Sequence, residues 1–424
     1  MSKEILGFSR NMLLWCILLY IGIWGGLLVN NYVFVVIAGC TLLVSLFSKI
    51  NTTYYHLFFL LPFSVIFKLS PSSTSLFAYL MIVTAIILLL RKRSIHAISG
   101  IMIILFIGYA IIGMGENYTT VAKMVAGMIL LQVFVTSASP DDFKNYIFSF
   151  GLGMLGSSVI GTLKDTWSRL TIYFDDIDYI YVNGLRSIRF SGLNYDPNYY
   201  SIGVIIVVFL CLRLFFNKDG NRFLLVGLIA TLVVFGLISY SKMFLLSISL
   251  LAIIFALHKT KSPKQFLTTF VSVLVIGGGF YWWANQFGYL ETMLERLSGS
   301  DISTGRFDIW KEYLNYIWNS PKTLLLGDGF GSPYYRSHGP HNAYIELIFF
   351  LGIIGGTIMV STVIHILGIN KLVTHRRFID WALVLLFFVM IATLGIVTVN
   401  DLMFYCMLLW ISMNMRRKTA LCGL

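Results

Sequence analysis

The feature that most constrains this chain is a series of apolar runs, each long enough to cross all or most of a lipid bilayer. A bilayer has a hydrocarbon core of about 30 Å, which takes about 20 apolar residues of helix to span. Runs approaching this length recur along the whole sequence. In lipid, backbone N–H and C=O groups must be paired within the protein, so such runs predict helices. The sequence therefore predicts an all-α, polytopic integral membrane protein with a single domain over residues 1–424.

Hydropathy predicts about fourteen transmembrane helices, within a range of about 12 to 14. The composition supports a membrane protein, because 58% of the 424 residues are hydrophobic and 12% are charged, which excludes a soluble globular domain. Lys3 and Arg10 precede the first run without a small-residue cleavage site, so we expect this span to be retained. The predicted spans are 11–28, 32–47, 55–69, 74–90, 97–114, 121–138, 146–163, 198–216, 223–238, 242–257, 266–283, 342–365, 381–398 and 401–415.

The basic residues between the spans predict the orientation of the chain. If the spans alternate, five basic segments fall on one side, which the positive-inside rule assigns to the cytoplasm together with both termini. The connections 164–197 and 284–340 then form two large extracytoplasmic loops. The net charge of +12 reflects this topology and the lipid headgroups, so we expect no nucleic-acid partner. The basic segments are Arg91–Arg93, Lys218–Arg222, Lys259–Lys264, Lys371–Arg377 and Arg416–Lys418.

A surface helix is predicted within the second large loop, over residues 306–319. Its apolar residues follow i, i+3, i+4 spacing, which indicates an amphipathic helix on the outer membrane surface. Pro321 ends this helix, and the glycines of Gly327–Gly331 predict a turn-rich loop. The apolar residues are Trp310, Tyr313, Leu314, Ile317 and Trp318.

A histidine is placed where the second large loop enters the twelfth span. The segment Gly339–Asn342 contains His341, and Gly352–Gly356 follows at a spacing close to three helical turns. We therefore expect Gly352 on the same helix face as His341, where Gly352 and Gly355 let a neighbouring helix approach closely. A helix start disfavours an imidazolium, so His341 is a candidate base. The alternative is an interfacial histidine above an ordinary helix-packing glycine pair.

Outward basic residues need an explanation in a membrane protein. Arg186 and Arg189 precede the eighth span, Arg306 opens the surface helix, and Arg336 lies shortly before His341. Helix N-termini favour anions, and arginine adds bidentate contacts with phosphate. An anion held at the outer leaflet suggests a lipid diphosphate.

Acidic residues near these arginines have several interpretations. Asp196-Pro197-Asn198 predicts a helix start with Asp196 as the N-cap. Glu346 either faces the same cavity as His341 or pairs with an outer lysine. The run Asp175–Asp178 could mimic the metal site of a nucleotide-sugar transferase, but outside the cell a solvated acidic turn is favoured. No metal-ligand spacing and no cofactor motif is present in the sequence.

Several of these segments resemble the O-antigen ligase superfamily. His341-Asn342, nine residues and then Gly352-x-x-Gly355 resemble its His-Asn-x9-Gly-x-x-Gly pattern. The superfamily contains O-antigen ligases and the repeat-unit polymerases of O-antigen and capsule. Further similarity lies in Arg189–Gly192 with Asp196–Asn198, in Thr304–Trp310 and in Leu326–Gly331, so the motifs cover about 189–356.

The resemblance implies a GT-C-like membrane transferase in the bacterial cytoplasmic (inner) membrane, with an active site that faces outward. Its donor would be a glycan on undecaprenyl diphosphate, transferred with inversion and without a metal or cofactor. His341 would be the catalytic histidine, and Arg189 and Arg306 would bind the diphosphate. The other site candidates are Arg186 and Arg336 for the diphosphate, with Asn342, Gly352, Gly355, Asp196, Asn198 and Glu346 in support.

The expected function is that of a polysaccharide repeat-unit polymerase. It would join the growing glycan to a sugar hydroxyl of a second lipid-linked unit, with membrane lipids and a chain-length regulator as further partners. The nearest alternative is an O-antigen ligase, which uses the same donor and transfers the glycan to lipid A–core. A lipid or solute transporter is disfavoured because no broken helices recur in matching halves. A structural scaffold does not explain outward arginines at helix starts.

Overall fold

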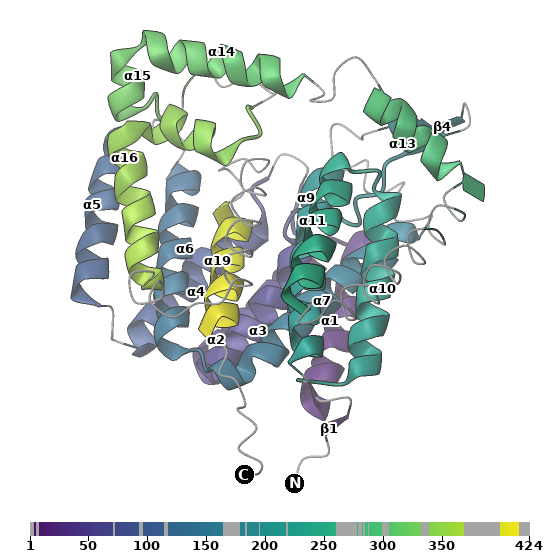
Figure 1. Ribbon diagram of the computed structural model, residues 1–424. Helices are drawn as coiled ribbons and strands as arrows, with labels where there is room; N and C mark the ends of the chain where they lie inside the picture. Colours follow the sequence, from purple (N-terminus) through teal and green to yellow (C-terminus); the bar gives the residue numbers. More distant parts are fainter. Residues whose placement is uncertain are drawn as a thin grey trace, which may run out of the picture.

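The protein is a bundle of α-helices, as the sequence predicts (Figure 1). The computed structural model describes residues 4–5, 8–70, 73–92, 96–113, 118–163, 179–182, 185–194, 196–217, 219–259, 278, 282, 285–286, 288–298, 305–330, 332, 339–368 and 399–414. The predicted spans at 266–283 and 381–398 lie outside these residues. The bundle helices are α1 (Arg10–Leu28), α2 (Val33–Phe47), α3 (Ile50–Leu60), α4 (Leu76–Lys92), α5 (Ala97–Gly113), α6 (Tyr118–Ser137), α7 (Phe143–Thr162), α9 (Pro197–Phe216), α10 (Arg222–Ile238), α11 (Lys242–Lys259), α16 (Ala343–Leu367) and α19 (Val399–Asn414).

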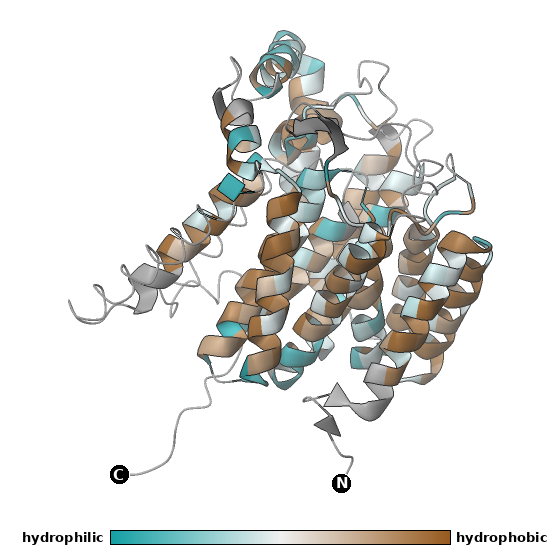
Figure 2. Cartoon of the chain, turned by 90° about the vertical axis from the view of Figure 1, so that its right-hand side faces the viewer, coloured by the Kyte–Doolittle hydropathy of each residue, from teal (hydrophilic) through white to brown (hydrophobic). Residues whose placement is uncertain are grey.

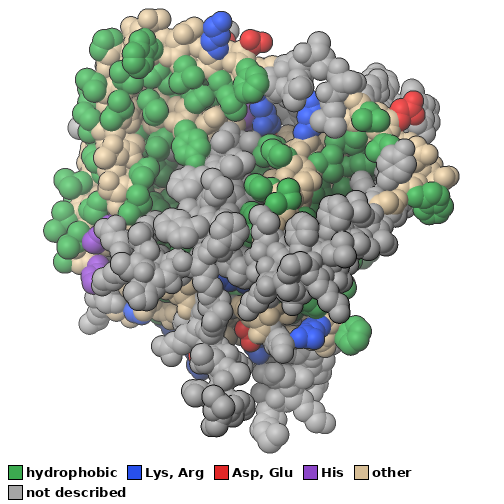
Figure 3. Space-filling model, viewed as in Figure 1, with side chains coloured by type: hydrophobic (Ala, Val, Ile, Leu, Met, Phe, Trp, Pro, Cys, Tyr) green, Lys and Arg blue, Asp and Glu red, His purple; other side chains and the backbone are tan. Residues whose placement is uncertain are grey.

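The helices have the character of membrane spans. Among the described residues, Tyr118–Ser137, Pro197–Asn217 and Ala343–Leu367 are long and apolar enough to cross a bilayer, and further apolar helices are shorter. Figure 2 shows hydrophobic residues along the bundle helices and hydrophilic residues mainly toward the helix ends. Hydrophobic side chains also gather on the outer surface over α5, α15 (Pro321–Leu326) and α16 (Figure 3). Such a surface suits lipid rather than water, while the number of fourteen spans stays a prediction.

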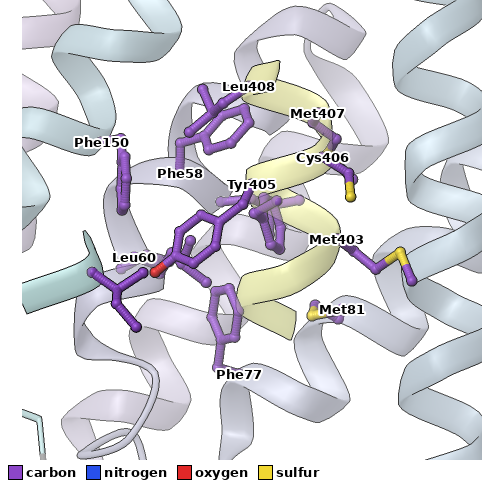
Figure 4. Packing of buried hydrophobic residues seen from close by; sticks show 14 of the residues in the cluster. Phe58, Leu60, Phe77, Met81, Phe150, Met403, Tyr405, Cys406, Met407 and Leu408 are labelled. Carbon is purple, nitrogen blue, oxygen red and sulfur yellow. The ribbon is translucent and has the colours of Figure 1, made fainter. Parts of the chain in front are cut away.

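An aromatic core joins the N-terminal helices to α19. Phe58 of α3 contacts Phe134 of α6 and Phe404 of α19, with ring centroids 6.0 and 5.2 Å apart. Tyr54 is fully buried and donates a 2.6 Å hydrogen bond to the Leu130 carbonyl, so its polar group is satisfied. Figure 4 shows the side chains of α19 inserted among Phe58, Phe77 and Phe150. The last described helix is therefore a central element of the bundle.

The predicted third span at 55–69 is corrected by the structure, in which the α-helix ends before Pro62. Helix α3 ends at Leu60 and is followed by a 3₁₀ turn, η1 (Leu61–Phe63). Pro62 lacks a backbone N–H and its ring restricts the residue before it, so an α-helix does not continue through it. The prediction of a continuous helix over 55–69 is wrong, because the apolar run extends past the end of the helix.

Small β-hairpins accompany the helices and were not predicted. In the first large loop, β3 (Tyr179–Val182) pairs antiparallel with β4 (Leu185–Ile188). The dipeptide between them is Asn183-Gly184, which favours tight hairpin turns. A second pair, β1 (Glu4–Ile5) and β2 (Phe8–Ser9), precedes α1.

The surface helix lies where the sequence predicts it, as α14 (Arg306–Asn319). Tyr313 and Ile317 are buried, and Tyr313 packs against Phe349 of α16 with ring centroids 5.2 Å apart. Leu314 and Trp318, which the sequence placed on the same apolar face, are exposed. Helix α14 thus lies across α16 at the end of the bundle that also carries α13 (Tyr289–Ser298) and β4 (Figure 1).

The opposite end of the bundle carries basic residues at helix termini. Lys92, at the end of α4, donates hydrogen bonds to the Thr136 carbonyl (2.9 Å) and the Ser137 hydroxyl (2.6 Å) at the end of α6. Arg91 donates to the Ser48 carbonyl at 2.7 Å. Cations are favoured at helix C-termini, so these basic residues stabilise the helix ends on this side of the bundle.

Helix α16 is broken at Gly352, which corrects the prediction of an uninterrupted twelfth span. Gly352 has φ 62° and ψ −176°, a conformation essentially restricted to glycine. The two parts of α16 run in different directions (Figure 1). The expectation that Gly352 lies on the same helix face as His341 assumed continuous helix and is wrong. The close approach expected at these glycines is confirmed, because Gly352 lies against the backbone of Leu325 and Gly327.

The break is held together by hydrogen bonds from the preceding loop. The backbone N–H of Asp328 donates to the Phe349 carbonyl at 2.7 Å, and that of Gly329 donates to the Phe350 carbonyl at 3.1 Å. The Tyr109 hydroxyl of α5 bonds the Leu351 carbonyl at 2.8 Å. Carbonyl groups released by the break therefore find partners within the protein, as a low-dielectric environment requires.

Replacing Gly352 tests this account of the break. A Gly352→Ala substitution places a Cβ against the backbone of Leu325 in a conformation that costs about 1–3 kcal/mol for a non-glycine residue. We expect a clearly lower midpoint of thermal unfolding for the purified protein in detergent. Gly108→Ala on α5 is the control, because a Cβ there meets open space. Equal midpoints for the two variants would contradict a strained, glycine-dependent break.

Candidate active site

His341 occupies a strained backbone position directly before α16. Its φ is 45°, one of two positive values for non-glycine residues in the described part of the chain. The carbonyl of the preceding Pro340 accepts a 2.7 Å hydrogen bond from the Trp310 indole N–H of α14. Asn342 caps α16 and accepts hydrogen bonds from the Tyr344 and Ile345 N–H groups at 3.0 and 3.3 Å. The residues on either side of His341 are therefore fixed by side-chain hydrogen bonds.

The helix starts one residue later than the predicted span 342–365. Asn342 is the N-cap and Ala343 is the first helical residue. An asparagine side chain accepts hydrogen bonds from the first free N–H groups of a helix, and histidine does so less readily. His341 consequently precedes the helix in a separate conformation, and its side chain is partly buried.

Arg306 is brought to the same side of the molecule as His341. It is the first residue of α14, after Gly305, whose φ is 80°. Trp310 lies about one helical turn further along α14, and its hydrogen bond to Pro340 ties this end of the helix to the His341 segment. Arg306 is partly exposed, so its guanidinium is available to a ligand.

Arg189 lies in a second polar cluster, formed by the start of α9 and the α10–α11 turn. Its side chain is buried, and Nε donates to the Ser239 carbonyl at 3.3 Å. The Ser239 hydroxyl lies 3.0 Å from that of Ser201, and the Ser241 hydroxyl donates to the Asn198 side chain at 2.9 Å. Arg189 is therefore held against two helices rather than extended into solvent.

The turn that holds Arg189 contains the other strained residue of the described chain. Tyr240 has φ 50° and lies between Ser239 and Ser241. Its ring stacks on Tyr289 of α13, with centroids 4.8 Å apart. Non-glycine residues in this region cost about 1–3 kcal/mol and cluster at functional sites. Both strained positions thus lie beside residues that the sequence identified as candidates for the site.

The supporting residues take mainly structural roles. Asp196 is the N-cap of α9 and accepts a 2.6 Å hydrogen bond from the Asn198 N–H, with Pro197 at the first helical position, as predicted. Glu346 is buried in the first turn of α16. Gly355 lies against the ring of Tyr109, so a side chain there would displace α5.

Some candidates lie where the structure describes no side chain. Arg186 is on β4, opposite Tyr181, and its side chain lies outside the described part. Arg336 and the run Asp175–Asp178 also lie outside the described residues. That Arg189, Arg306 and His341 surround one cavity therefore stays a prediction. Within the described ranges, no three His, Cys, Asp or Glu side chains come together as metal ligands.

Asp328 is a residue of the site region that the sequence analysis missed. Its carboxylate accepts a 3.1 Å hydrogen bond from the Tyr316 hydroxyl of α14, while its N–H bonds the broken α16. Burial and the neighbouring Asp328 raise the pKa of Tyr316, which keeps this hydroxyl a donor. The position of Asp328 between Gly327 and Gly329 could have predicted this role, because an acidic residue in a tight glycine loop often fixes the local backbone.

The N-cap of α16 predicts a loss of stability that unfolding measurements can detect. Asn342→Ala removes the acceptor for two helix N–H groups, and we expect a loss of stability of about 1 kcal/mol. Asn342→Asp and Asn342→Ser keep a capping oxygen and should unfold within about 0.5 kcal/mol of the original protein. Thermal or denaturant unfolding in detergent measures the difference. An alanine variant as stable as the original would show that the cap is unimportant.

Comparison with known families supports the interpretation of this region. The family model described as O-antigen ligase matches residues 225–360, which include most of α10, α11, α14, the His341 segment and the break at Gly352. Comparisons with curated proteins and with solved structures find no match. The matched family is one of glycosyltransferase-like enzymes, and with the apolar helices it indicates a membrane-embedded protein. The resemblance predicted from the sequence is confirmed over this segment, because residues 225–360 match the O-antigen ligase family.

Proposed function

We propose that the protein is a polysaccharide repeat-unit polymerase. It transfers a glycan from undecaprenyl diphosphate to a sugar hydroxyl of another lipid-linked unit, with inversion at the transferred sugar and without a metal. The observation that carries this proposal is the strained His341, fixed between Pro340 and Asn342 inside the segment that matches the O-antigen ligase family. Backbone strain persists only where the surroundings enforce it, and it is typical of active sites.

His341 takes the role of the base in this proposal. General-base catalysis requires a group within hydrogen-bond reach of the proton that it removes, and histidine is the side chain best suited near neutral pH. The acceptor hydroxyl gives its proton to the imidazole while its oxygen attacks the anomeric carbon. The bond from that carbon to the diphosphate oxygen breaks, and the undecaprenyl diphosphate leaves with the bonding electron pair.

Arg306 and Arg189 stabilise the diphosphate in this proposal. Negative charge grows on the leaving group as the glycosidic bond breaks, and fixed positive groups lower the energy of that state. Arg306 is partly exposed at the start of α14, where the helix dipole adds a favourable field. Arg189 is buried against the Ser239 carbonyl, which restricts its guanidinium to a narrow range of positions.

The alternative function is that of an O-antigen ligase, because the matched family is compatible with both activities. The ligase uses the same donor chemistry and the same residues but transfers the glycan to lipid A–core. A reconstituted reaction distinguishes the two activities. Purified protein given lipid-linked repeat units alone should produce a ladder of longer glycans, whereas a ligase requires lipid A–core to form product.

The proposed roles predict different defects in two variants. His341→Ala should lower product formation by about 10²–10⁴-fold and retain binding of the lipid-linked glycan. Arg306→Lys keeps the charge and loses the bidentate geometry, so it should weaken donor binding as well as turnover. Product ladders on gels and binding of labelled donor measure the two effects.

Matched variants and a chelator provide the controls for these measurements. His365→Ala, an exposed histidine at the far end of α16, and Arg222→Lys, an exposed arginine at the start of α10, should leave activity unchanged. We expect activity to persist in EDTA, because arginines provide the counter-charge of the diphosphate. Full activity in His341→Ala would contradict the mechanism. A loss of activity in EDTA that magnesium restores would also contradict it, and would make Asp175–Asp178 the candidate metal site.

The proposed orientation has its own test. Ser187→Cys and Ser337→Cys lie in the predicted extracytoplasmic loops, and an impermeant thiol reagent should label both in intact cells. A cysteine in 416–424, the predicted cytoplasmic end, should react only after permeabilisation, and the native Cys422 serves this purpose. The reverse pattern would show that the site faces the cytoplasm, where the proposed donor glycan is not presented.

A further inference from the structure

Helix α13, in the predicted second large loop, packs on the α10–α11 turn that holds Arg189. Tyr289 and Met293 of α13 are buried and lie about one helical turn apart, so they form one apolar face of this helix. The face forms a small hydrophobic core, separate from the main core of the bundle. The partly buried members of this small core are Leu237, Tyr240, Leu245 and Leu290.

Tyr240 is the residue of the turn that meets α13 through an aromatic stack. Its φ is 50°, and a non-glycine residue keeps such a backbone only where its surroundings enforce it. The rings of Tyr240 and Tyr289 have centroids 4.8 Å apart and an interplanar angle of 27°. Stacked aromatic pairs stabilise a structure beyond the area that they bury. The contact with Tyr289 therefore helps to hold the turn in its strained conformation.

Both neighbours of Tyr240 in the chain bond the residues around Arg189. The Ser239 carbonyl accepts the 3.3 Å hydrogen bond from Arg189 Nε, and the Ser241 hydroxyl donates to the Asn198 side chain at 2.9 Å. The Ser239 carbonyl belongs to the planar peptide group that ends at the Tyr240 Cα. Rotation about φ of Tyr240 therefore changes the direction of this carbonyl, and with it the position of the Arg189 side chain.

Helix α13 also lies against the hairpin that leads to Arg189. It packs on β3, which pairs with β4, and β4 ends at Ile188, directly before Arg189. Figure 1 shows α13 beside β4 at the upper end of the bundle. The same helix thus contacts the segment before Arg189 and the turn that binds its side chain.

The orientation of Arg189 matters for a phosphate ligand. Arginine presents its N–H donors in one rigid plane, so a hydrogen bond from Nε fixes the direction of the terminal N–H groups. Bidentate contacts with phosphate require that plane to be aligned with the ligand. A side chain that is already oriented loses less conformational freedom on binding, which increases affinity.

We propose that Tyr289 is a positioning residue for Arg189, and that it acts through the stack on Tyr240 and the Ser239 carbonyl. The inference rests on the proposed function, in which Arg189 binds the diphosphate of the donor. It assigns α13 the role of keeping the guanidinium in its binding orientation. Tyr289 itself does not contact the substrate in this account.

A double-mutant cycle tests the proposal by the binding of undecaprenyl diphosphate to purified protein in detergent. Tyr289→Ala should raise the Kd by about tenfold, and Arg189→Ala by at least as much, because a hydrogen bond to a charged group is weakened or lost. If Tyr289 acts through Arg189, the double variant should bind no more weakly than Arg189→Ala alone. A contribution of Tyr289 that is independent of Arg189 would lower the affinity further in the double variant.

Three further variants separate positioning from a general loss of structure. Tyr289→Phe keeps the stacked ring and should bind within about twofold of the original protein. Leu294→Ala removes an exposed side chain of the same helix and should leave the Kd unchanged. Tyr240→Gly removes the ring but adopts a positive φ without strain, so it should fold and still bind about as weakly as Tyr289→Ala. Thermal midpoints show which variants are folded, and Tyr240→Gly replaces Tyr289→Ala in the cycle if the latter unfolds.

The outcomes separate this inference from the proposed function. Additive losses in the double variant, or an unchanged Kd in folded Tyr289→Ala, overturn the positioning role and leave the proposed function intact. An unchanged Kd in Arg189→Ala removes Arg189 from the diphosphate site, which contradicts that part of the proposed function and the inference with it. Non-additive losses in a protein that forms no glycan product support the positioning role and reject the transferase.

Discussion

The end of the bundle that carries α14 depends on the hydrogen bonds that the backbone forms at the break in α16. Gly352 leaves helical geometry, and the carbonyl groups of Phe349 and Phe350 bond the N–H groups of Asp328 and Gly329 instead. An unpaired carbonyl in an apolar environment costs several kcal/mol, so the loop and the helix stabilise each other. The direction of the first part of α16, and with it the position of the His341 segment, follows from these bonds.

Two clusters at this end hold the residues proposed for catalysis and binding. In one, Trp310 of α14 fixes the carbonyl before His341. In the other, the α10–α11 turn holds Arg189, and Tyr240 in that turn has the second strained backbone of the described residues. Strain at both clusters indicates that packing enforces these conformations. A transferase gains from such rigidity, because groups fixed before the reaction need no reorganisation during it.

Much of the fold and of the candidate site could be predicted from local patterns. Helix α14 has the predicted bounds, and the Asp196 cap with Pro197 at the first helical position is confirmed. The predicted helix bounds were wrong where an apolar pattern extends beyond the helix itself. The apolar run at 55–69 continues past the end of α3 before Pro62, and the apolar run after His341 continues across the break at Gly352. Hydropathy alone therefore indicates neither feature. The hairpin of β3 and β4 was not predicted, although the Asn183-Gly184 dipeptide between the strands favours a tight turn.

The sequence by itself determined the membrane character, the helix caps, the surface helix and the resemblance to the O-antigen ligase superfamily, because each depends on neighbouring residues or on one contiguous motif. Only the tertiary structure decided how the break in α16 is stabilised, since the Tyr109 hydroxyl bonds the Leu351 carbonyl across 242 positions of the chain. Hydropathy and capping follow helical periodicity along the chain, whereas this contact depends on which helices pack side by side, and a single sequence does not specify that choice locally.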